Sequence, residues 1–248
     1  MLKRLSVFLY GVLCYVVFFA TFLYAIGFVC NLYVPRTMDG PPVAPLATSL
    51  LVDLGLLVLF ALQHSIMARP AFKAWWTQFI PEPAERSTYV LASSVALIAL
   101  FAYWQPLGGV VWNVDQPAAV ITLYALCAFG WLLVLLSTFL INHFDLFGLR
   151  QVWLYLIGKP YTHLTFRTPG PYRLVRHPLY VGWLFAFWAT PDMTLTHLLF
   201  ALVTTGYILA AIQLEERDLV THLGSQYSDY RKRVPMLIPG TSLLRSRH

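Results

Sequence analysis

Charged residues are scarce in this chain, and their scarcity excludes a water-soluble globular fold. Of the 248 residues, 11% are Asp, Glu, Lys or Arg, whereas 58% are hydrophobic and the mean hydropathy is +0.65. Soluble domains carry roughly 25% charged residues. The composition therefore predicts a membrane protein that crosses the bilayer several times.

Cysteine is also scarce, which excludes a disulfide-stabilised scaffold. The chain has three cysteines, Cys14, Cys30 and Cys127, and each lies within a long apolar stretch. In such a position cysteine acts as a small apolar residue. Because no two cysteines are close in the sequence and none has a histidine partner, we expect neither a disulfide nor a metal site.

Long apolar runs, by contrast, are abundant. A bilayer core of ~30 Å takes about 20 helical residues, and the runs that reach or nearly reach this length are Leu5–Cys30, Leu46–Met67, Ser87–Trp104 and Ala118–Ile141. Lys3 and Arg4 precede the first run, as in a signal peptide, but no small-residue cleavage site follows, so we expect a retained anchor. We expect Ser87 or Thr88 to cap the third helix.

A fifth apolar region, 179–214, is predicted to form a helical hairpin. Its first part, Leu179–Thr190, spans only about 18 Å as a helix, roughly half of the bilayer core. Pro191 ends it, and Asp192 or Thr194 is expected to cap a returning helix from Leu195 to about Leu214. A half-length helix at membrane depth implies a cavity beside it.

The distribution of basic residues predicts the orientation. With the N-terminus in the cytoplasm, alternating spans place Arg36 outside and the other sixteen of the seventeen Lys and Arg residues inside, as the positive-inside rule requires. A hairpin in the fifth region keeps Arg217, 231–233, Arg245 and Arg247 inside. The net charge of +6 is thus explained by topology, and we expect no nucleic-acid partner.

The predicted fold class is all-α. It is an integral membrane bundle of about five transmembrane elements, the last a helical hairpin, with a cytoplasmic cofactor pocket. We expect one integrated domain with two parts. Residues 1–141 form a four-span region with an aromatic interfacial segment at 70–80. Residues 142–248 form a cytoplasmic loop, the hairpin and a C-terminal tail.

Polar residues within or beside the spans are candidates for function, because they are costly in a membrane. Asp53 lies two turns into the second span, where internal hydrogen bonding in helix packing is the favoured interpretation. His64, near the cytoplasmic end, is a candidate for a substrate pocket. His143 and Asp145 follow the fourth span, where they form either a helix-ending turn or the lining of a pocket, with Asp145 holding a cation or orienting His143. Residues 152–168 are expected to be a loop or strand-like cover.

The two ends of the hairpin carry the densest polar clusters. Arg176, His177 and Tyr180 stand at its start, and Glu215 and Glu216 at its end. Together they suit a ligand with both an ammonium and a carboxylate group. The alternative is a salt-bridged interfacial belt that pairs Arg176 with Glu216 and Arg173 with Asp218. The residues by themselves leave both possibilities open.

Two ordered motifs in this region resemble a known family. The first is Arg-His-Pro-x-Tyr-x-Gly at 176–182, and the second is Glu-Glu-x-x-Leu-x-x-x-x-Gly-x-x-Tyr-x-x-Tyr at 215–230, followed by Val234-Pro235 and Ile238-Pro239. They resemble the integral-membrane superfamily of isoprenylcysteine carboxyl methyltransferases and phospholipid methyltransferases. The segments 63–69, 85–89 and 142–151 extend the likeness to the branch that contains bacterial methanethiol S-methyltransferases and NnrU-like proteins. At the hairpin turn, Ala189-Thr190-Pro191-Asp192 replaces the Asn-Pro turn of the carboxyl methyltransferases, which leaves the acceptor open.

The resemblance implies S-adenosylmethionine as methyl donor and a set of site residues. The donor would be bound by Tyr172, Arg173, His177, Tyr180, Gly182 and Glu215. The resemblance also places Arg176 and Glu216 nearer the acceptor. From the chemistry of a thiol acceptor we expect His143 and Asp145 to remove its proton and Arg176 to supply a positive charge, so the predicted catalytic residues are His143, Asp145, Arg176 and Glu216. Aromatic faces and carboxylates suit the donor's sulfonium and ammonium groups.

The expected activity is methyl transfer to a small apolar thiol that arrives through the lipid bilayer, releasing a thioether such as dimethyl sulfide. A non-catalytic NnrU-like accessory protein is one alternative. A methyltransferase for a lipid amine or a prenylcysteine carboxylate is another. The expected location is the bacterial inner membrane, with both termini in the cytoplasm and no metal.

Overall fold

A computed structural model describes residues 1–241, so Arg245 and Arg247 of the orientation argument lie outside the described residues. The chain divides into two compact units, each considered by itself below. Unit 1 comprises residues 1–111, 142–164 and 193–197, and unit 2 comprises 112–141, 165–192 and the chain from 198 onward.

Within the described chain, five helices are long and apolar enough to cross a membrane, which confirms the predicted multi-pass α-helical protein. They are α1 (Leu2–Val29), α2 (Leu46–Met67), α4 (Glu85–Tyr103), α5 (Pro117–Ile141) and α9 (Leu195–Leu223). Their bounds lie close to the apolar runs in the sequence, because a run of some 20 apolar residues has one stable form in lipid, a helix that satisfies its own backbone.

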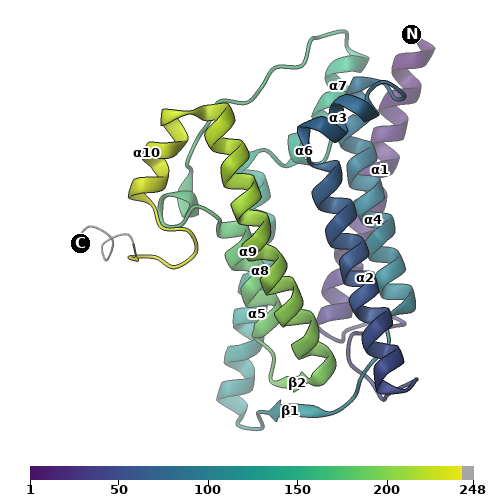
Figure 1. Cartoon of the computed structure of the whole chain (residues 1–248), viewed down its shortest axis with the longest axis vertical. Coiled ribbons are helices and arrows are strands. Elements are labelled where there is room, and N and C mark those ends of the chain that lie inside the picture. The colour runs from purple at the N-terminus through teal and green to yellow at the C-terminus, as the bar shows by residue number, and fades with distance from the viewer. Residues whose placement is uncertain (242–248) are drawn as a thin grey trace. The chain divides into compact units, whose positions relative to one another are not determined.

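In unit 1, α4 packs against both α1 and α2, and Figure 1 shows the three helices side by side. Short helices gather at the end of the unit that holds the N-terminus: α3 (Pro70–Trp76), the 3-10 turn η1 (Glu82–Ala84), α6 (His143–Leu146) and α7 (Leu149–Leu156). Helix α7 lies on α1, where a Cβ on Gly11 would stand 2.6 Å from Val152 Cγ2. Glycine at that position is what allows α7 to approach so closely.

Two sequence expectations in unit 1 were wrong. Residues 152–156, the start of the expected loop or strand-like cover at 152–168, instead belong to α7, because Gly148 takes a left-handed φ of 87° after α6 and lets a second helix begin. The cap of α4 also differs: the helix starts at Glu85 after η1, and Ser87 and Thr88 lie inside it. Thr88 bonds the carbonyl of Ala84, one turn back in the chain, instead of capping an end.

A polar cluster closes the other end of unit 1. Asp39 accepts hydrogen bonds from Asn31 Nδ2 at 2.7 Å and from Thr194, and it lies 3.3 Å from His197 Nδ1. Burial by itself raises the pKa of Asp39, but the bonds from His197, Thr194 and Asn31 outweigh it, so the pKa lies below its ordinary value. Thr194 also accepts from the His197 N–H at 3.1 Å, which confirms it as the cap of α9.

In unit 2, α8 (Pro178–Trp188) packs along α5, and the two helices run antiparallel. Their closest approach is at two glycines: a Cβ on Gly182 would stand 2.8 Å from the Gly130 carbonyl oxygen, and a Cβ on Gly130 would stand 2.7 Å from the Gly182 oxygen. At 11 residues, α8 is as short as predicted.

The return from α8 to α9 passes through a strand, β2 (Asp192–Thr194), which pairs with β1 (Val110–Asn113) ahead of α5. In unit 2 this turn is held by Val114 N–H, which donates to the Pro191 carbonyl at 3.0 Å. The returning helix begins at Leu195, as expected, but extends to Leu223 instead of ending near Leu214. Acidic and basic residues with good helix propensity continue the helix beyond its apolar part.

The C-terminal part of unit 2 folds back on the start of α8. Helix α10 (Ser225–Arg233) follows α9 after Gly224, and a 3-10 turn, η2 (Gly170–Arg173), precedes α8. Tyr227 and Tyr230 on α10 are buried, and the Tyr230 hydroxyl donates to the Tyr172 carbonyl at 2.5 Å. The tail therefore fixes η2 beside α10.

Candidate functional site

Arg176 is the centre of a buried polar corner in unit 2. Its Nε donates to Glu216 Oε1 at 2.6 Å, and its Nη1 donates to the carbonyls of Arg231 and Val234 at 3.0 and 2.6 Å. The Arg176 N–H donates to Pro235 at 2.8 Å. The side chains of Arg176 and Glu216 are each 7% exposed. The predicted pairing of Arg176 with Glu216 is therefore present, but it is buried and does not form a solvent-exposed belt.

His177 connects this ion pair to a second acid. Its Nε2 lies 3.0 Å from Glu216 Oε1, and its Nδ1 lies 3.9 Å from Glu215 Oε2. The Tyr180 hydroxyl donates to the same Glu215 oxygen at 3.1 Å. The structure thus brings Arg176, His177, Tyr180 and both glutamates together, from the start of α8 and from α9.

The two neighbouring acids differ in environment. Glu216 has a 7% exposed side chain and is engaged by Arg176 and His177, with Arg231 at 3.7 Å. Glu215 is 47% exposed and, within residues 1–241, accepts a hydrogen bond from Tyr180. A carboxylate can accept about four hydrogen bonds. Glu215 can therefore accept further hydrogen bonds from a cationic group of a ligand, whereas the contacts of Glu216 are with groups of the protein.

Tyrosines form one wall of this corner and stay protonated. Burial raises the pKa of Tyr230 to about 12, with the nearby Arg176 opposing the rise and Glu216 adding to it. Burial likewise raises the pKa of Tyr172 and Tyr227 above the ordinary value. Tyr227 and Tyr230 are buried, so of these three only the half-buried Tyr172 has ring surface that a ligand cation could contact.

The other predicted donor-binding residues lie on η2 and α8. Tyr172 is half-buried and its hydroxyl donates to the Ser137 carbonyl at 3.5 Å. Arg173 is exposed, and its Nε donates to the Thr168 carbonyl at 3.4 Å. Gly182 faces Gly130 and Val134 of α5, so its close approach is to a neighbouring helix.

In unit 1, His143 is buried in an aromatic cage. It is 3% exposed, its Nε2 lies 2.9 Å from the Tyr15 hydroxyl, and its ring centroid lies 4.8 Å from that of Phe147. Burial lowers the pKa of His143. The imidazole is therefore neutral at pH 7 and able to accept a proton, although it is a weaker base than an exposed histidine.

Asp145 has cationic and hydroxyl partners. Its Oδ1 accepts from Arg150 Nη1 at 2.8 Å and its Oδ2 from the Tyr161 hydroxyl at 3.2 Å. Arg150 also donates to the Thr162 carbonyl at 2.8 Å. Asp145 is thus paired with a cation of the protein itself, and its role in lining a pocket stays a prediction.

His64 takes part in a hydrogen-bonded set between α2 and α4. Its Nε2 lies 2.8 Å from the Tyr89 hydroxyl, its Nδ1 lies 3.1 Å from Ser93 Oγ, and its ring stacks on Phe60 at 5.2 Å. Asp53 is fully buried and accepts from the Gln105 N–H at 2.9 Å, the structural kind of contact favoured for it.

Sequence reasoning missed several partners of these groups. Tyr15 and His143 are 128 positions apart, and Tyr89 and His64 are 25 apart. The carbonyls of Arg231, Val234 and Pro235 that engage Arg176 carry no side-chain signal. Spacing between a tyrosine and a histidine in separate spans gives no indication of contact, because the order of helices in a bundle is not encoded locally.

The fold and the polar corner define a multi-pass membrane protein with a buried arginine–acid cluster beside a half-length helix. The chain is similar over nearly its full length to curated proteins. It is 59% identical over 238 residues to the methanethiol S-methyltransferase of Crocosphaera subtropica, covering 96% of this chain and 93% of that protein. It is 55% identical to the methanethiol S-methyltransferase of Mycobacterium tuberculosis, with 96% and 98% covered.

A third relative, methanethiol S-methyltransferase 1 of Bradyrhizobium diazoefficiens, is 54% identical over 94% of this chain and 81% of its own length. No family model matches the chain. No solved structure matches it either. The chain belongs to the methanethiol S-methyltransferase family. It is a membrane enzyme of the methyltransferase class, which sets aside the non-catalytic alternative.

Proposed function

We propose that the chain transfers the methyl group of S-adenosylmethionine to methanethiol and releases dimethyl sulfide. The observation that carries this proposal is the identity of 50% or more, over 95% or more of the chain, to proteins named for that acceptor. The proposed location is the bacterial inner membrane, with both termini in the cytoplasm. There the donor is available from water and the small apolar thiol from lipid.

The corner in unit 2 has groups that fit this donor. The half-exposed Glu215 keeps acceptor capacity for an ammonium group, and the exposed Arg173 has guanidinium N–H groups for a carboxylate. The rings of Tyr172 and Tyr180 offer aromatic surface for a sulfonium. We assign donor binding to these four residues together with His177, and leave out Gly182 because it packs against α5.

For this reaction the protein has to position the two substrates and remove a proton from the thiol. When bound, the donor supplies a methyl group activated on sulfonium sulfur, and the thiolate takes this methyl while the carbon–sulfur electron pair stays on the donor sulfur. A small alkyl thiol is mostly protonated at pH 7 and its thiolate is the nucleophile. We assign the removal of its proton to His143 and Asp145, with His64 in the substrate pocket.

We assign Arg176 and Glu216 to the acceptor side of the reaction. Arg176 is a permanent cation, and a positive charge favours thiolate over thiol. Its Nε and Nη1 bonds fix the guanidinium in one orientation, which is the preorganisation that stabilises developing charge without rearrangement. Glu216 would act through Arg176 and His177, which it holds in place.

The test uses purified protein, methyl-labelled S-adenosylmethionine and methanethiol. We expect labelled dimethyl sulfide in the headspace, and a much smaller yield from Arg176→Gln. Lys232→Gln is the matched control, because Lys232 is an exposed cation paired with Asp229 outside the corner. A panel with a lipid amine and a prenylcysteine carboxylate completes the assay. Donor binding without any labelled thioether would overturn the proposed acceptor, and absence of donor binding would overturn the proposed cofactor.

A further inference from the structure

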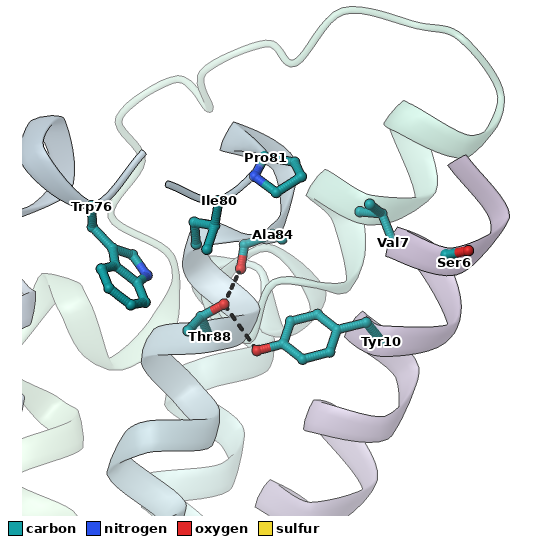
Figure 2. Close-up of a pocket in the computed structure, with 8 residues that line it drawn as sticks. All are labelled: Ser6, Val7, Tyr10, Trp76, Ile80, Pro81, Ala84 and Thr88. Atoms are coloured by element: carbon teal, nitrogen blue, oxygen red, sulfur yellow. Dashed lines mark hydrogen bonds between the residues drawn. The ribbon is translucent and has the colours of Figure 1, made fainter. Parts of the chain in front are cut away.

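Unit 1 contains an apolar cavity that the proposed reaction does not use. It has a volume of about 420 Å³, and it lies where the first turns of α1 and α4 meet α3 and η1. Figure 2 shows its lining, to which Val7, Tyr10, Trp76, Ile80, Ala84 and Thr88 contribute. Ligand pockets typically measure roughly 300–1,000 Å³, so the cavity is large enough for part of a small molecule.

The hydroxyl groups around this cavity are already satisfied. Thr88 Oγ1 donates to the Ala84 carbonyl at 2.9 Å and lies 3.0 Å from the Tyr10 hydroxyl, as Figure 2 shows. Ser6 Oγ donates to the Leu2 carbonyl at 3.0 Å. The wall therefore presents mainly hydrocarbon, which suits an alkyl chain and does not suit a sugar or a nucleotide.

The surroundings of the cavity are those of a membrane interface. Helix α3 and the turn after it bring four aromatic rings together, and two of them, Trp75 and Phe79, are 49% and 67% exposed. Tryptophan prefers the headgroup level of a bilayer. Trp76 from the same group lines the cavity, and its indole nitrogen is buried without an acceptor among the described residues.

The chain segments that line the cavity carry more positive than negative charge. The segments that line it, 2–10 and 69–88, contain five basic residues and two acidic ones. The basic residues are Lys3, Arg4, Arg69, Lys73 and Arg86, and the acidic ones are Glu82 and Glu85. Lys3 precedes Ser6, Val7 and Tyr10 by three, four and seven positions and so shares their face of α1, while Lys73 stands one turn before Trp76.

Lys3 and Arg4 also stand in the first turn of α1, which contains no acidic residue. The helix dipole makes this position unfavourable for cations and favourable for anions. Arg4 lies over the Tyr155 ring at 5.6 Å. Lys3 is exposed and has no acidic partner among the described residues. A phosphate at this position would neutralise the lysine and complement the dipole together.

We propose that this cavity binds one acyl chain of an anionic phospholipid, whose phosphate lies between Lys3 and Lys73. The chain would fill the apolar space between α1, α3 and α4, and the headgroup would lie at the level of the aromatic rings. Juxtamembrane cations attract anionic lipids in this way. The site concerns unit 1 and is independent of the proposed transfer reaction.

Native mass spectrometry of the purified protein tests this proposal with phosphatidylglycerol and phosphatidylcholine of identical acyl chains. We expect the wild type to retain phosphatidylglycerol in preference to phosphatidylcholine. In the double variant Lys3→Gln/Lys73→Gln, this preference should fall about fivefold for each cation removed. Ile80→Trp, which fills the cavity, should retain neither lipid. Ser6→Phe fills it from an exposed position and serves if Ile80→Trp fails to fold. Lys232→Gln should behave as the wild type.

Three outcomes would overturn the proposal. One is equal retention of both lipids by the wild type, and another is unchanged retention by both filling variants. The third is that the wild type is a dimer, and that the filling variants are monomers with unchanged lipid retention. The cavity would then be covered by a second copy of the chain.

Discussion

At the residue scale, Glu215 and Glu216 show how adjacent identical side chains acquire different roles. They follow each other on α9, so they point in directions about 100° apart around the helix. Glu216 faces the buried Arg176, and Glu215 remains half-exposed beside Tyr180. The sequence analysis assigned Glu215 to the donor and Glu216 to the catalytic group, and the structure adds that the two side chains differ in burial.

We expect substitution to separate their effects as well. Glu215→Gln should weaken binding of S-adenosylmethionine about 10- to 100-fold, as expected for loss of a charge-assisted hydrogen bond, while the unfolding temperature changes little. Glu216→Gln should destabilise the protein by about 3–5 kcal/mol, because it leaves a buried arginine without its counterion. Isothermal titration and thermal unfolding in detergent measure the two effects. Equal loss of stability in both variants would contradict this division.

His143 supports a prediction about pH. Its folded-state pKa lies below the ordinary value, about 6.5 in the unfolded chain. At a pH between these two pKa values, the unfolded chain binds more protons than the folded chain does. The free energy of unfolding therefore rises with pH over this range. The contribution of neutral His143 to the free energy of unfolding is complete above about pH 6.5, and it is lost as the pH falls through the folded-state pKa.

The unfolding temperature of the wild type should therefore decrease from about pH 7 to about pH 5 by more than that of His143→Gln, which cannot be protonated. A cost of about 1.4 kcal/mol for each unit of pKa shift sets the scale. Parallel pH profiles for the two proteins would show that the histidine does not contribute.

At the element scale, the contact between α5 and α8 depends on glycine. A Cβ on Gly182 would meet backbone atoms of Gly130 and Val134 at 2.8 Å, and backbone cannot rotate away as a side chain can. Gly206 on α9 is a matched control, because a Cβ there meets nothing within 4 Å. The same chemical change thus has different consequences on two helices of one unit.

We expect Gly182→Ala to destabilise unit 2 by about 1–3 kcal/mol through overpacking. Gly206→Ala should be neutral or stabilising by about 0.5–1 kcal/mol, because alanine favours the helix. Thermal unfolding of both variants, with retained S-adenosylmethionine binding as a second readout, measures the difference. Similar unfolding temperatures for the two variants would mean that α5 and α8 do not pack as closely as described.

The sequence was informative about elements wherever one local signal decided them. Leu46–Met67 was predicted to the residue, and the turn at Pro191 with its Thr194 cap was recovered because proline and a capping hydroxyl act over a few residues. Helix α7 was missed because its start depends on the left-handed Gly148. Contacts such as Tyr15 with His143 depend on the packing of α1 against later helices, which no local pattern specifies.

At the scale of the whole molecule, the orientation remains a prediction. Sixteen of seventeen basic residues fall on one side if the N-terminus is cytoplasmic. The loops with Arg36 and Asp115 and the hairpin turn at Pro191 then face the opposite side. A membrane protein with this distribution should insert in one orientation.

Cysteine labelling tests the orientation in a variant that lacks the native cysteines. Lys232→Cys should react with a membrane-impermeant maleimide in inverted vesicles and stay unlabelled in intact spheroplasts. Asp115→Cys should give the reverse result and so serves as the control. Labelling of Lys232→Cys from outside would place the C-terminal tail in the periplasm and contradict both the hairpin topology and access of a cytosolic donor.

The bonds from Arg176 to the carbonyls of Arg231, Val234 and Pro235 have a consequence for biosynthesis. The ribosome makes the arginine well before it makes these acceptors, which follow it by 55 to 59 positions. The helices can insert one after another as they emerge, but the arginine cannot reach its final state until residues 231–235 have been made. A truncated product that ends before residue 231 would therefore enter the membrane and yet lack the carbonyl partners of Arg176.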